Sequence, residues 1–410
     1  MNISPNFSPP ITLMKPYFLL SGFFYFVSMF WLFFINPFTE LKDFHLVGWV
    51  HLYMLGFVML AIFSAMAQLG PIVVETNHYN VNIFKYLFLF LVIGLILMLV
   101  GFYIDISFLL YGGILVLIAM CIYAIEFLLT LKGAKRTTSI TKAMKMSNFF
   151  LLTGIVTGLI MAAAFNGLIN INPHAILNIH TFGLVVGFVI LLIMGISIIL
   201  LPMFGSAKRI SDNEFSNSFI TVSIGVLIMM LSPFLFTKVT ENIAYTVTII
   251  SILLYFYQLY KMTASRKKIE HDIWAKSMYV AFSSFVISFF LLVSYLFIQE
   301  ETILRVGMWI IFVGFFGFII MGNFYKIIPF LVWFHIYSPL IEERPVPMLH
   351  ELLPQRLANL QFFYGTVGLI TSSTALLIQD SKLFFGGLLL LTVSGFVFFI
   401  TINKTLKTDI

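Results

Sequence analysis

Four histidines stand at the beginning of two long apolar runs, with the same spacing in both. His45 and His51 lie in "HLVGWVH", and His174 and His180 lie in "HAILNIH", so five residues separate the members of each pair. Neutral imidazole is the usual protein ligand for haem iron, copper and zinc. A polar ring beside hydrocarbon is costly unless it has a partner or a function. The pattern therefore predicts a haem or metal site near the start of these runs.

The two members of each pair are expected to have different roles. Residues six positions apart in a regular helix point roughly 120° away from each other, so neither pair can grip one ion from a straight helix. His51 and His180, deeper in the runs, are the candidate cofactor ligands, and His45 and His174, nearer the water, are the candidate metal ligands. The alternative is that they are interfacial histidines, hydrogen-bonded to the Asn-rich segment around residue 172. Both explanations stay open at this point.

Composition identifies the chain as a membrane protein. Of its 410 residues, 60% are hydrophobic and 10% are charged, whereas a soluble domain carries about 25% charged residues. The net charge of +6 does not indicate nucleic-acid binding, because the cations lie in short loops between apolar runs. Cys121 is the single cysteine, which excludes a disulfide framework and a thiolate metal cluster. No cleavable signal peptide is expected, since the first apolar run is long enough to stay in the bilayer.

Each membrane-spanning helix needs about 20 apolar residues. On this criterion the chain is all-α, a single transmembrane domain over residues 1–410, and the tight 104–107 turn is its shortest connection. The predicted helices are 15–36, 46–70, 83–104, 107–130, 146–168, 175–201, 216–236, 242–260, 275–298, 303–333, 358–378 and 382–402.

Cations are concentrated in alternate loops, which predicts the orientation of the chain. One set of loops carries Lys132, Lys135, Arg136, Lys142, Lys145, Lys208, Arg209, Lys261, Arg266, Lys267, Lys268, Lys276, Arg344, Arg356, Lys404 and Lys407. The opposite loops carry Lys42, Lys238, Arg305 and Lys382. The positive-inside rule places the first set, and both termini, in the cytoplasm. The four histidines are then expected on the outer, periplasmic side of a bacterial inner membrane. Glu126, near the inner end of the fourth helix, is expected to reach the interface, and the alternative is a role in a proton relay.

A Gly–Pro spacing recurs in every fourth helix. Gly56 precedes Pro71 by fifteen residues, Gly187 precedes Pro202 by fifteen, and Gly314 precedes Pro329 by fifteen. Glycine permits close helix approach in a bilayer, and each proline is expected to close the inner end of its helix. This regularity predicts three four-helix repeats, near 15–130, 146–260 and 275–402.

Twelve helices in three four-helix arcs, with histidines on the second and sixth, resemble the catalytic subunit (subunit I) of haem-copper oxidases and the NnrS-like membrane proteins. His51, in "GWVHLYMLG", matches the position of the oxidase low-spin haem ligand. His174 and His180 fall on the helix where the oxidase carries a copper ligand. The resemblance implies a pseudo-threefold arrangement, a b-type haem held by His51 and His180, and copper or a haem propionate near His45 and His174.

The chain lacks several histidines that ligate copper and haem in the oxidases. The 216–236 helix has no histidine, and in the 303–333 region His335 lies at the inner end, opposite to the oxidase haem ligands. A binuclear oxygen-reducing centre is therefore not predicted. The NnrS-like group, described as haem- and copper-containing and linked to nitric oxide stress, is the nearer analogue.

Two functions remain for comparison. The first is a haem- or copper-binding protein of redox chemistry, nitric oxide response or metal handling. No CxxCH occurs, so haem is not attached covalently, and electrons or metal would come from a partner protein. The alternative is a secondary transporter, which usually shows two related halves. An intramembrane metalloprotease is excluded, because the chain has no HExxH. The sequence leaves open whether the chain is an enzyme.

Overall fold

The computed structural model describes residues 7, 9–235, 237–266 and 271–407. Across these residues the chain forms helices and connections and no strand, and twelve helical segments are long and apolar enough to span a membrane. The prediction of an all-α protein with twelve spanning helices is confirmed. The segments are Ile11–Phe34, Phe44–Val74, Val81–Tyr103, Phe108–Lys132, Ser139–Phe165, Pro173–Gly205, Asp212–Phe234, Lys238–Ala264, Ile273–Ile298, Glu301–Leu340, Gln355–Ile378 and Ser381–Leu406.

The predicted 104–107 turn can be compared directly with these boundaries. The tight break predicted at 104–107 separates α4 (Phe84–Tyr103) from α5 (Phe108–Lys132). Residue 236, Lys267, Lys268 and both chain ends lie outside the described residues.

Residue contacts divide the chain into two compact units. Unit 1 includes Ala67–Glu270, and unit 2 includes Pro9–Met66 and His271–Ile410. The helix α3 (Leu60–Val74) contributes its first half to unit 2 and its second half to unit 1. Each unit is described separately.

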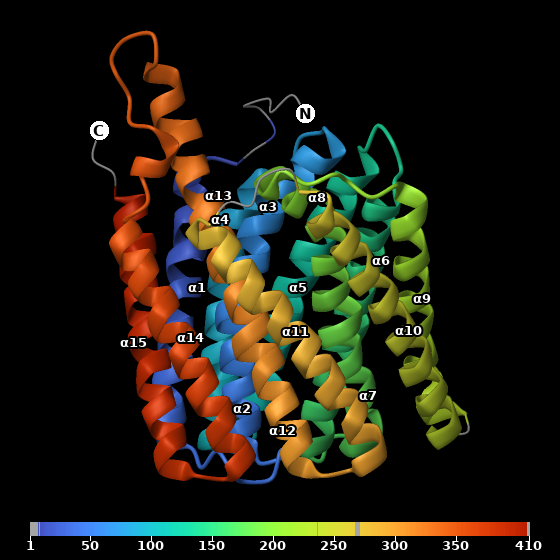
Figure 1. Ribbon diagram of the computed structural model, residues 1–410. Helices are drawn as coiled ribbons and strands as arrows, with labels where there is room; N and C mark the ends of the chain where they lie inside the picture. Colours follow the sequence, from blue (N-terminus) through green and yellow to red (C-terminus); the bar gives the residue numbers. More distant parts are fainter. Residues whose placement is uncertain (1–6, 8, 236, 267–270, 408–410) are drawn as a thin grey trace. The chain divides into compact units, whose positions relative to one another are not determined.

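Unit 1 is a succession of neighbouring helices along the chain. The helices α4 and α5 pack against each other, and α5 also packs on α6 (Ser139–Phe165). In turn, α6 contacts α7 (Pro173–Phe182), α8 (Leu191–Gly205) and α9 (Asp212–Leu231). The last helix, α10 (Thr237–Ala264), lies alongside α9, as Figure 1 shows in yellow-green. This order places α6 at the centre of the contacts that hold the histidine-bearing α7.

Unit 2 brings the first helix of the chain together with the last. The helix α15 (Ser381–Leu406) packs between α1 (Ile11–Trp31) and α14 (Gln355–Ile378), and the red and orange helices α15 and α14 run side by side in Figure 1. The helix α11 (Ile273–Ile298) packs on α12 (Glu301–Trp309) and α13 (Gly317–Val332). The short α2 (Phe44–His51) continues into this unit's share of α3.

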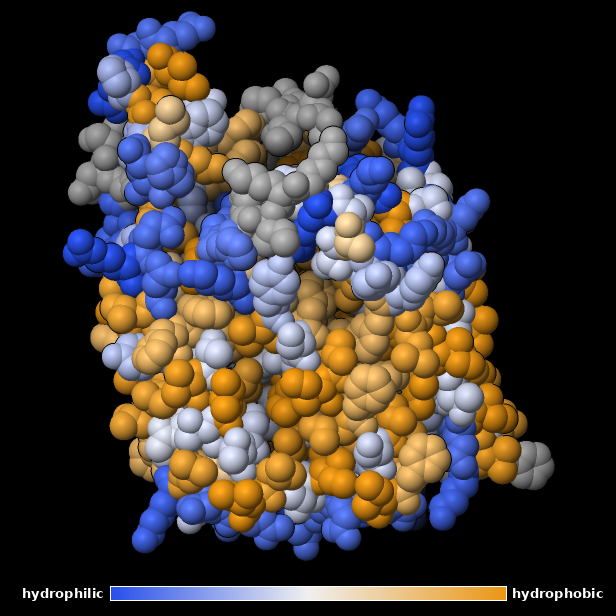
Figure 2. Space-filling model, in the orientation of Figure 1, coloured by the Kyte–Doolittle hydropathy of each residue, from blue (hydrophilic) through white to orange (hydrophobic). Residues whose placement is uncertain are grey.

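The surface of the helices has the polarity expected for a bilayer. In Figure 2 hydrophobic side chains cover the middle of the helices, while hydrophilic side chains gather at their ends. Large apolar side chains such as Ile93, Phe290 and Phe396 are exposed on mid-helix surfaces. Exposed apolar side chains at this depth of the helices fit the hydrocarbon environment of a bilayer.

The three Gly–Pro helices share one unusual backbone feature. Each contains a π-helical segment: η3 (Leu52–Met59), η5 (Gly183–Ile190) and η7 (Ile310–Phe316). In each, the glycine of the repeated spacing is the fifth residue. π-Helical turns are rare, occur mostly inside α-helices and are frequent at functional sites. The three segments therefore have the same order of elements, α then π then α, in the same register.

The prolines do not close these helices as the sequence predicted. The helices α3, α8 and α13 continue to Val74, Gly205 and Val332, each three residues beyond its proline. A proline removes one backbone donor and leaves one carbonyl of the preceding turn without its usual partner, which does not by itself end a helix. At Pro71 that carbonyl belongs to Ala67, and a side chain supplies the missing donor.

The repeated glycines are places of close helix approach. A Cβ built at Gly56 would lie 2.8 Å from the ring of Phe24, and one at Gly187 would lie 2.8 Å from the ring of Phe150. At Gly314 it would lie 2.5 Å from the hydroxyl of Ser284. In all three cases the contact is with the preceding membrane-spanning helix, α1, α6 or α11. The glycines are thus required by packing, as expected for helices that touch inside a bilayer.

Candidate functional site

The helix α2 presents two of the candidate histidines in unit 2. Asp43 caps its start, accepting hydrogen bonds from the backbone N–H groups of His45 and Leu46. The indole N–H of Trp49 donates to the Ser28 carbonyl at 2.9 Å and fixes the helix on α1. His45 belongs to the first turn, its side chain is 58% exposed, and its Nδ1 lies 3.4 Å from Asp43 Oδ1. His45 is therefore solvent-facing.

His51 lies one to two turns deeper and is half-buried. Its Nδ1 is 2.8 Å from the backbone carbonyl oxygen of Val47. Because a carbonyl only accepts hydrogen bonds, Nδ1 carries a proton and donates it. In the neutral ring the lone pair is then on Nε2. This is the tautomer that histidine adopts when Nε2 binds a metal or haem iron.

His180 lies in unit 1, near the end of α7, and is also half-buried. Its Nδ1 is 2.8 Å from the carbonyl oxygen of Gly154 on the neighbouring helix α6. One turn along α6, Gly158 leaves the space that the ring occupies. A Cβ built there would lie 2.6 Å from His180 Cε1 and 2.8 Å from Nδ1. The carbonyl of Gly154 thus holds the His180 ring by a hydrogen bond, and Gly158 leaves the space in which the ring lies.

His174 stands at the opposite end of α7 and is exposed. Asn172 caps this helix by accepting a hydrogen bond from the backbone N–H of His174 at 3.0 Å. The imidazole ring lies edge-on to Phe165, with 6.3 Å between the ring centroids. Its surroundings are those of an interfacial side chain.

His51 and His180 share one local arrangement although they belong to different units. Each directs Nδ1 at a backbone carbonyl 2.8 Å away, and each lies shortly before a π-helical segment, η3 or η5. Counted from the repeated glycines, however, His51 is five residues before Gly56 and His180 is seven before Gly187. The two histidines are therefore not equivalent positions of the repeat.

Metal ligation at His45 and His174 stays a prediction. Within the described residues, no group of three or more His, Cys, Asp and Glu side chains is close enough to hold a metal ion. His45 has a carboxylate neighbour in Asp43, and the ring neighbour of His174 is Phe165, which offers no ligand atom.

One expectation from the sequence was wrong. Glu126 does not reach the interface: it is 3% exposed, and its carboxylate contacts the side chains of His78 and Thr130. A weak signal for this pairing is present in the sequence. A glutamate inside an apolar run needs a partner, but the partner is in a connection 48 residues earlier in the chain.

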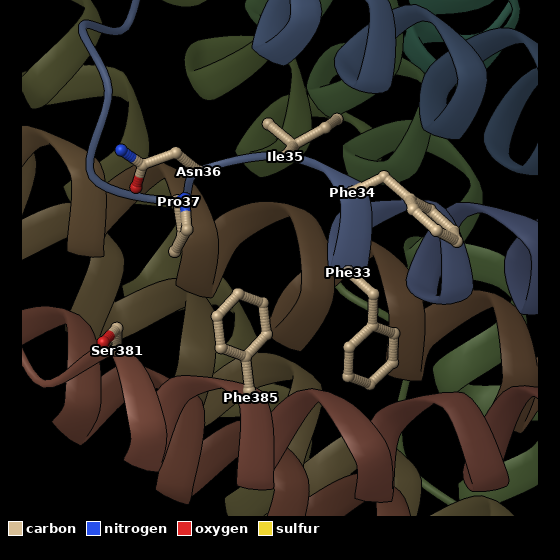
Figure 3. A pocket seen from close by; sticks show the side chains of 7 residues that line it. All are labelled: Phe33, Phe34, Ile35, Asn36, Pro37, Ser381 and Phe385. Atoms are coloured by element: carbon tan, nitrogen blue, oxygen red, sulfur yellow. The ribbon is translucent and has the colours of Figure 1, made fainter.

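A shallow hollow of about 320 Å³ lies elsewhere in unit 2 (Figure 3). It is lined by Phe33, Phe34, Ile35, Asn36, Pro37, Ser381 and Phe385. The rings of Phe33 and Phe385 stack there, 5.9 Å apart, while Phe34 points away. The lining has no titratable or metal-ligating side chain, so this hollow does not compete with the histidines as a chemical site.

Comparison with known proteins assigns no relationship to this arrangement. The sequence matches no protein-family model, and a search of curated proteins finds no match either.

Proposed function

We propose that this chain is an oxidase-like membrane protein that binds a b-type haem, with His51 and His180 as the candidate ligands. The observation that carries the proposal is the arrangement common to these two half-buried rings. In both, Nδ1 donates to a backbone carbonyl at 2.8 Å. That hydrogen bond fixes the ring orientation and makes Nε2 the ligating nitrogen, as in histidines that bind haem iron or metals.

The side chains present suit a haem better than a structural metal ion. Haem iron needs only two axial protein ligands, while a closed metal site needs three or four. Each unit offers one anchored imidazole of the kind that ligates haem iron, and the described residues hold no cluster that meets the second requirement. When bound, a haem would supply one-electron chemistry. His51 and His180 would orient it, and the apolar helices around them would limit the access of water.

The proposed setting follows from charge and polarity. The connection between α5 and α6 carries Lys132, Lys135 and Arg136, which the positive-inside rule places in the cytoplasm of a bacterial cell. The histidine-bearing ends of α2 and α7 would then face the periplasm. Redox chemistry, nitric oxide handling and metal assembly all fit such a haem. The chain has no covalent haem motif of its own, so the electrons or the metal would come from an electron-donor or metal-delivery partner.

Optical spectra of the purified full-length protein test the proposal. Glutamine substitutions suit this test because a glutamine amide can still donate to the carbonyl that each ring contacts. His51→Gln and His180→Gln are each expected to abolish or shift the Soret band at unchanged expression. The matched controls, His45→Gln and His174→Gln, are expected to retain the wild-type spectrum. A folded wild-type protein that stays colourless after haem addition would reject the proposal and favour a transporter.

A further inference from the structure

A buried histidine and glutamate meet at one end of α5, within unit 1. His78, in the connection between α3 and α4, places its Nδ1 2.8 Å from Oε1 of Glu126 on α5. The two side chains are 4% and 3% exposed. The hydroxyl of Thr130, one turn later on α5, donates to the same carboxylate oxygen at 2.8 Å. Among the described residues, Oε2 of Glu126 meets no hydrogen-bond partner.

The second ring nitrogen of His78, Nε2, acts as a hydrogen-bond donor to a helix carbonyl that a proline leaves without its usual partner. In an α-helix the carbonyl of residue 67 would accept from the backbone N–H of residue 71, but residue 71 is a proline and has no N–H. Nε2 of His78 lies 2.7 Å from this Ala67 carbonyl and replaces the missing donor. A carbonyl cannot donate, so Nε2 must carry a hydrogen.

The remaining contact then requires one further proton. With a hydrogen fixed on Nε2, Nδ1 is a bare acceptor unless it is also protonated, and an ionised carboxylate is only an acceptor. Two acceptors 2.8 Å apart in a buried site repel each other. A single proton between Nδ1 and Oε1 removes this conflict, whether it resides on the imidazole or on the carboxyl group. The pair with this proton has no net charge, as burial requires.

We propose that His78 and Glu126 form a proton-binding site whose occupancy holds the α3–α4 connection against α5. The connection has a second anchor at the same place, because the backbone N–H of Tyr79 donates to the Thr130 hydroxyl at 3.1 Å. When the proton leaves to water, a neutral imidazole and a carboxylate remain face to face. Their repulsion favours moving His78 away, which opens the connection and uncovers the Ala67 carbonyl.

The groups around the pair are either aromatic or charged and exposed to water. On α5 the Tyr123 phenol interacts electrostatically with Glu126 and is itself fully buried. The Phe84 ring at the start of α4 lies edge-on to His78, 5.3 Å between centroids. The charged residues of the surrounding elements, Glu75, Lys85 and Lys132, are exposed and therefore screened by water.

Hydrogen exchange of residues 75–80 in the full-length protein tests the proposal, with the rates corrected at each pH by those of an unstructured peptide of the same residues. The wild type is expected to protect this connection at neutral pH and to lose roughly tenfold or more of that protection at alkaline pH, as for a lost hydrogen bond to a charged group. In Glu126→Gln the amide nitrogen can take the place of Oε1, donating one hydrogen to Nδ1 of His78 and the other to the hydroxyl oxygen of Thr130. This variant is expected to keep its protection at both pH values. Glu126→Ala should lose it at both.

Equal pH responses of the wild type and Glu126→Gln, after correction by the unstructured peptide, would overturn the proposal. A second measurement applies if Glu126→Gln does not close the connection at any pH. In protein labelled with ¹⁵N-histidine, His78 is expected to give a low-field, slowly exchanging ring proton at neutral pH that disappears at alkaline pH. The exposed His45 should give none. The absence of this signal from the folded wild type would also refute the proposal. The result does not depend on haem, so it can hold or fail separately from the proposed function.

Discussion

Gly158→Ala is expected to displace the His180 ring, because the glycine provides the space that the ring fills. The new Cβ would lie 2.6 Å from Cε1, so the ring must retreat by about 0.8 Å to reach the 3.4 Å of an ordinary contact. A retreat of that size away from Gly154 would stretch the 2.8 Å bond from Nδ1 to about 3.6 Å, a separation at which a hydrogen bond no longer exists. Overpacking of this kind costs about 1–3 kcal/mol.

The control for this variant is Gly195→Ala, in α8 of the same unit. A Cβ at Gly195 would lie 3.7 Å from its nearest neighbour, which is an ordinary contact, and alanine is the better helix former. Unfolding of the purified protein in detergent should show Gly158→Ala less stable than the wild type and Gly195→Ala equal to it or more stable. If both variants are equally stable, the His180 ring is not confined by Gly158, and the reasoning about its orientation fails.

Three further predictions concern packing, anchoring and charge. Gly187→Ala should lower stability by about 1–3 kcal/mol, because its Cβ would overlap an aromatic ring of α6; an unchanged unfolding midpoint would contradict the close approach. Arg305→Lys should lower the free energy of unfolding by about 1 kcal/mol and speed proteolysis of the 35–43 connection. The two terminal nitrogens of the arginine guanidinium donate to the Pro37 carbonyl and to a carboxylate at the same time, and lysine has only one nitrogen. The backbone N–H and hydroxyl of Ser107 hold the pKa of Asp105 below its ordinary value. The ionised carboxylate therefore stabilises the fold at pH values above its unfolded-state pKa. This stabilisation is lost as the pH falls through the lower pKa of the folded state. Ser107→Ala keeps the N–H and should raise that pKa only part of the way, measured by carboxyl ¹³C titration; no rise would exclude a contribution from the hydroxyl.

The helices could be predicted from sequence because bilayer thickness fixes their length and apolar character. Even the short 104–107 turn was predictable, since two apolar runs flank it without room for a loop. The repeated spacing that begins at Gly56 predicts three close helix contacts, and the structure has all three. These features depend on local composition, which the sequence displays directly.

The π-helical segments and the partners of the buried polar groups could not be predicted in this way. Hydropathy does not distinguish η3 from an α-helix, because a change of backbone register alters no side chain. The contact of His180 with Gly154 joins residues 26 positions apart, and that of His78 with Glu126 joins residues 48 apart. Such pairs depend on which helices become neighbours. The prediction that Glu126 reaches the interface was wrong because its partner, His78, could not be identified from the sequence.

The most direct test of the central claim is the ligation of iron in the purified, haem-loaded protein, read by low-temperature electron paramagnetic resonance with near-infrared magnetic circular dichroism. Two imidazole ligands should give a low-spin bis-histidine spectrum in the wild type, converted to high spin when either His51 or His180 becomes glutamine. A wild-type protein that binds no haem, or a bis-histidine spectrum that survives both substitutions, would contradict the account.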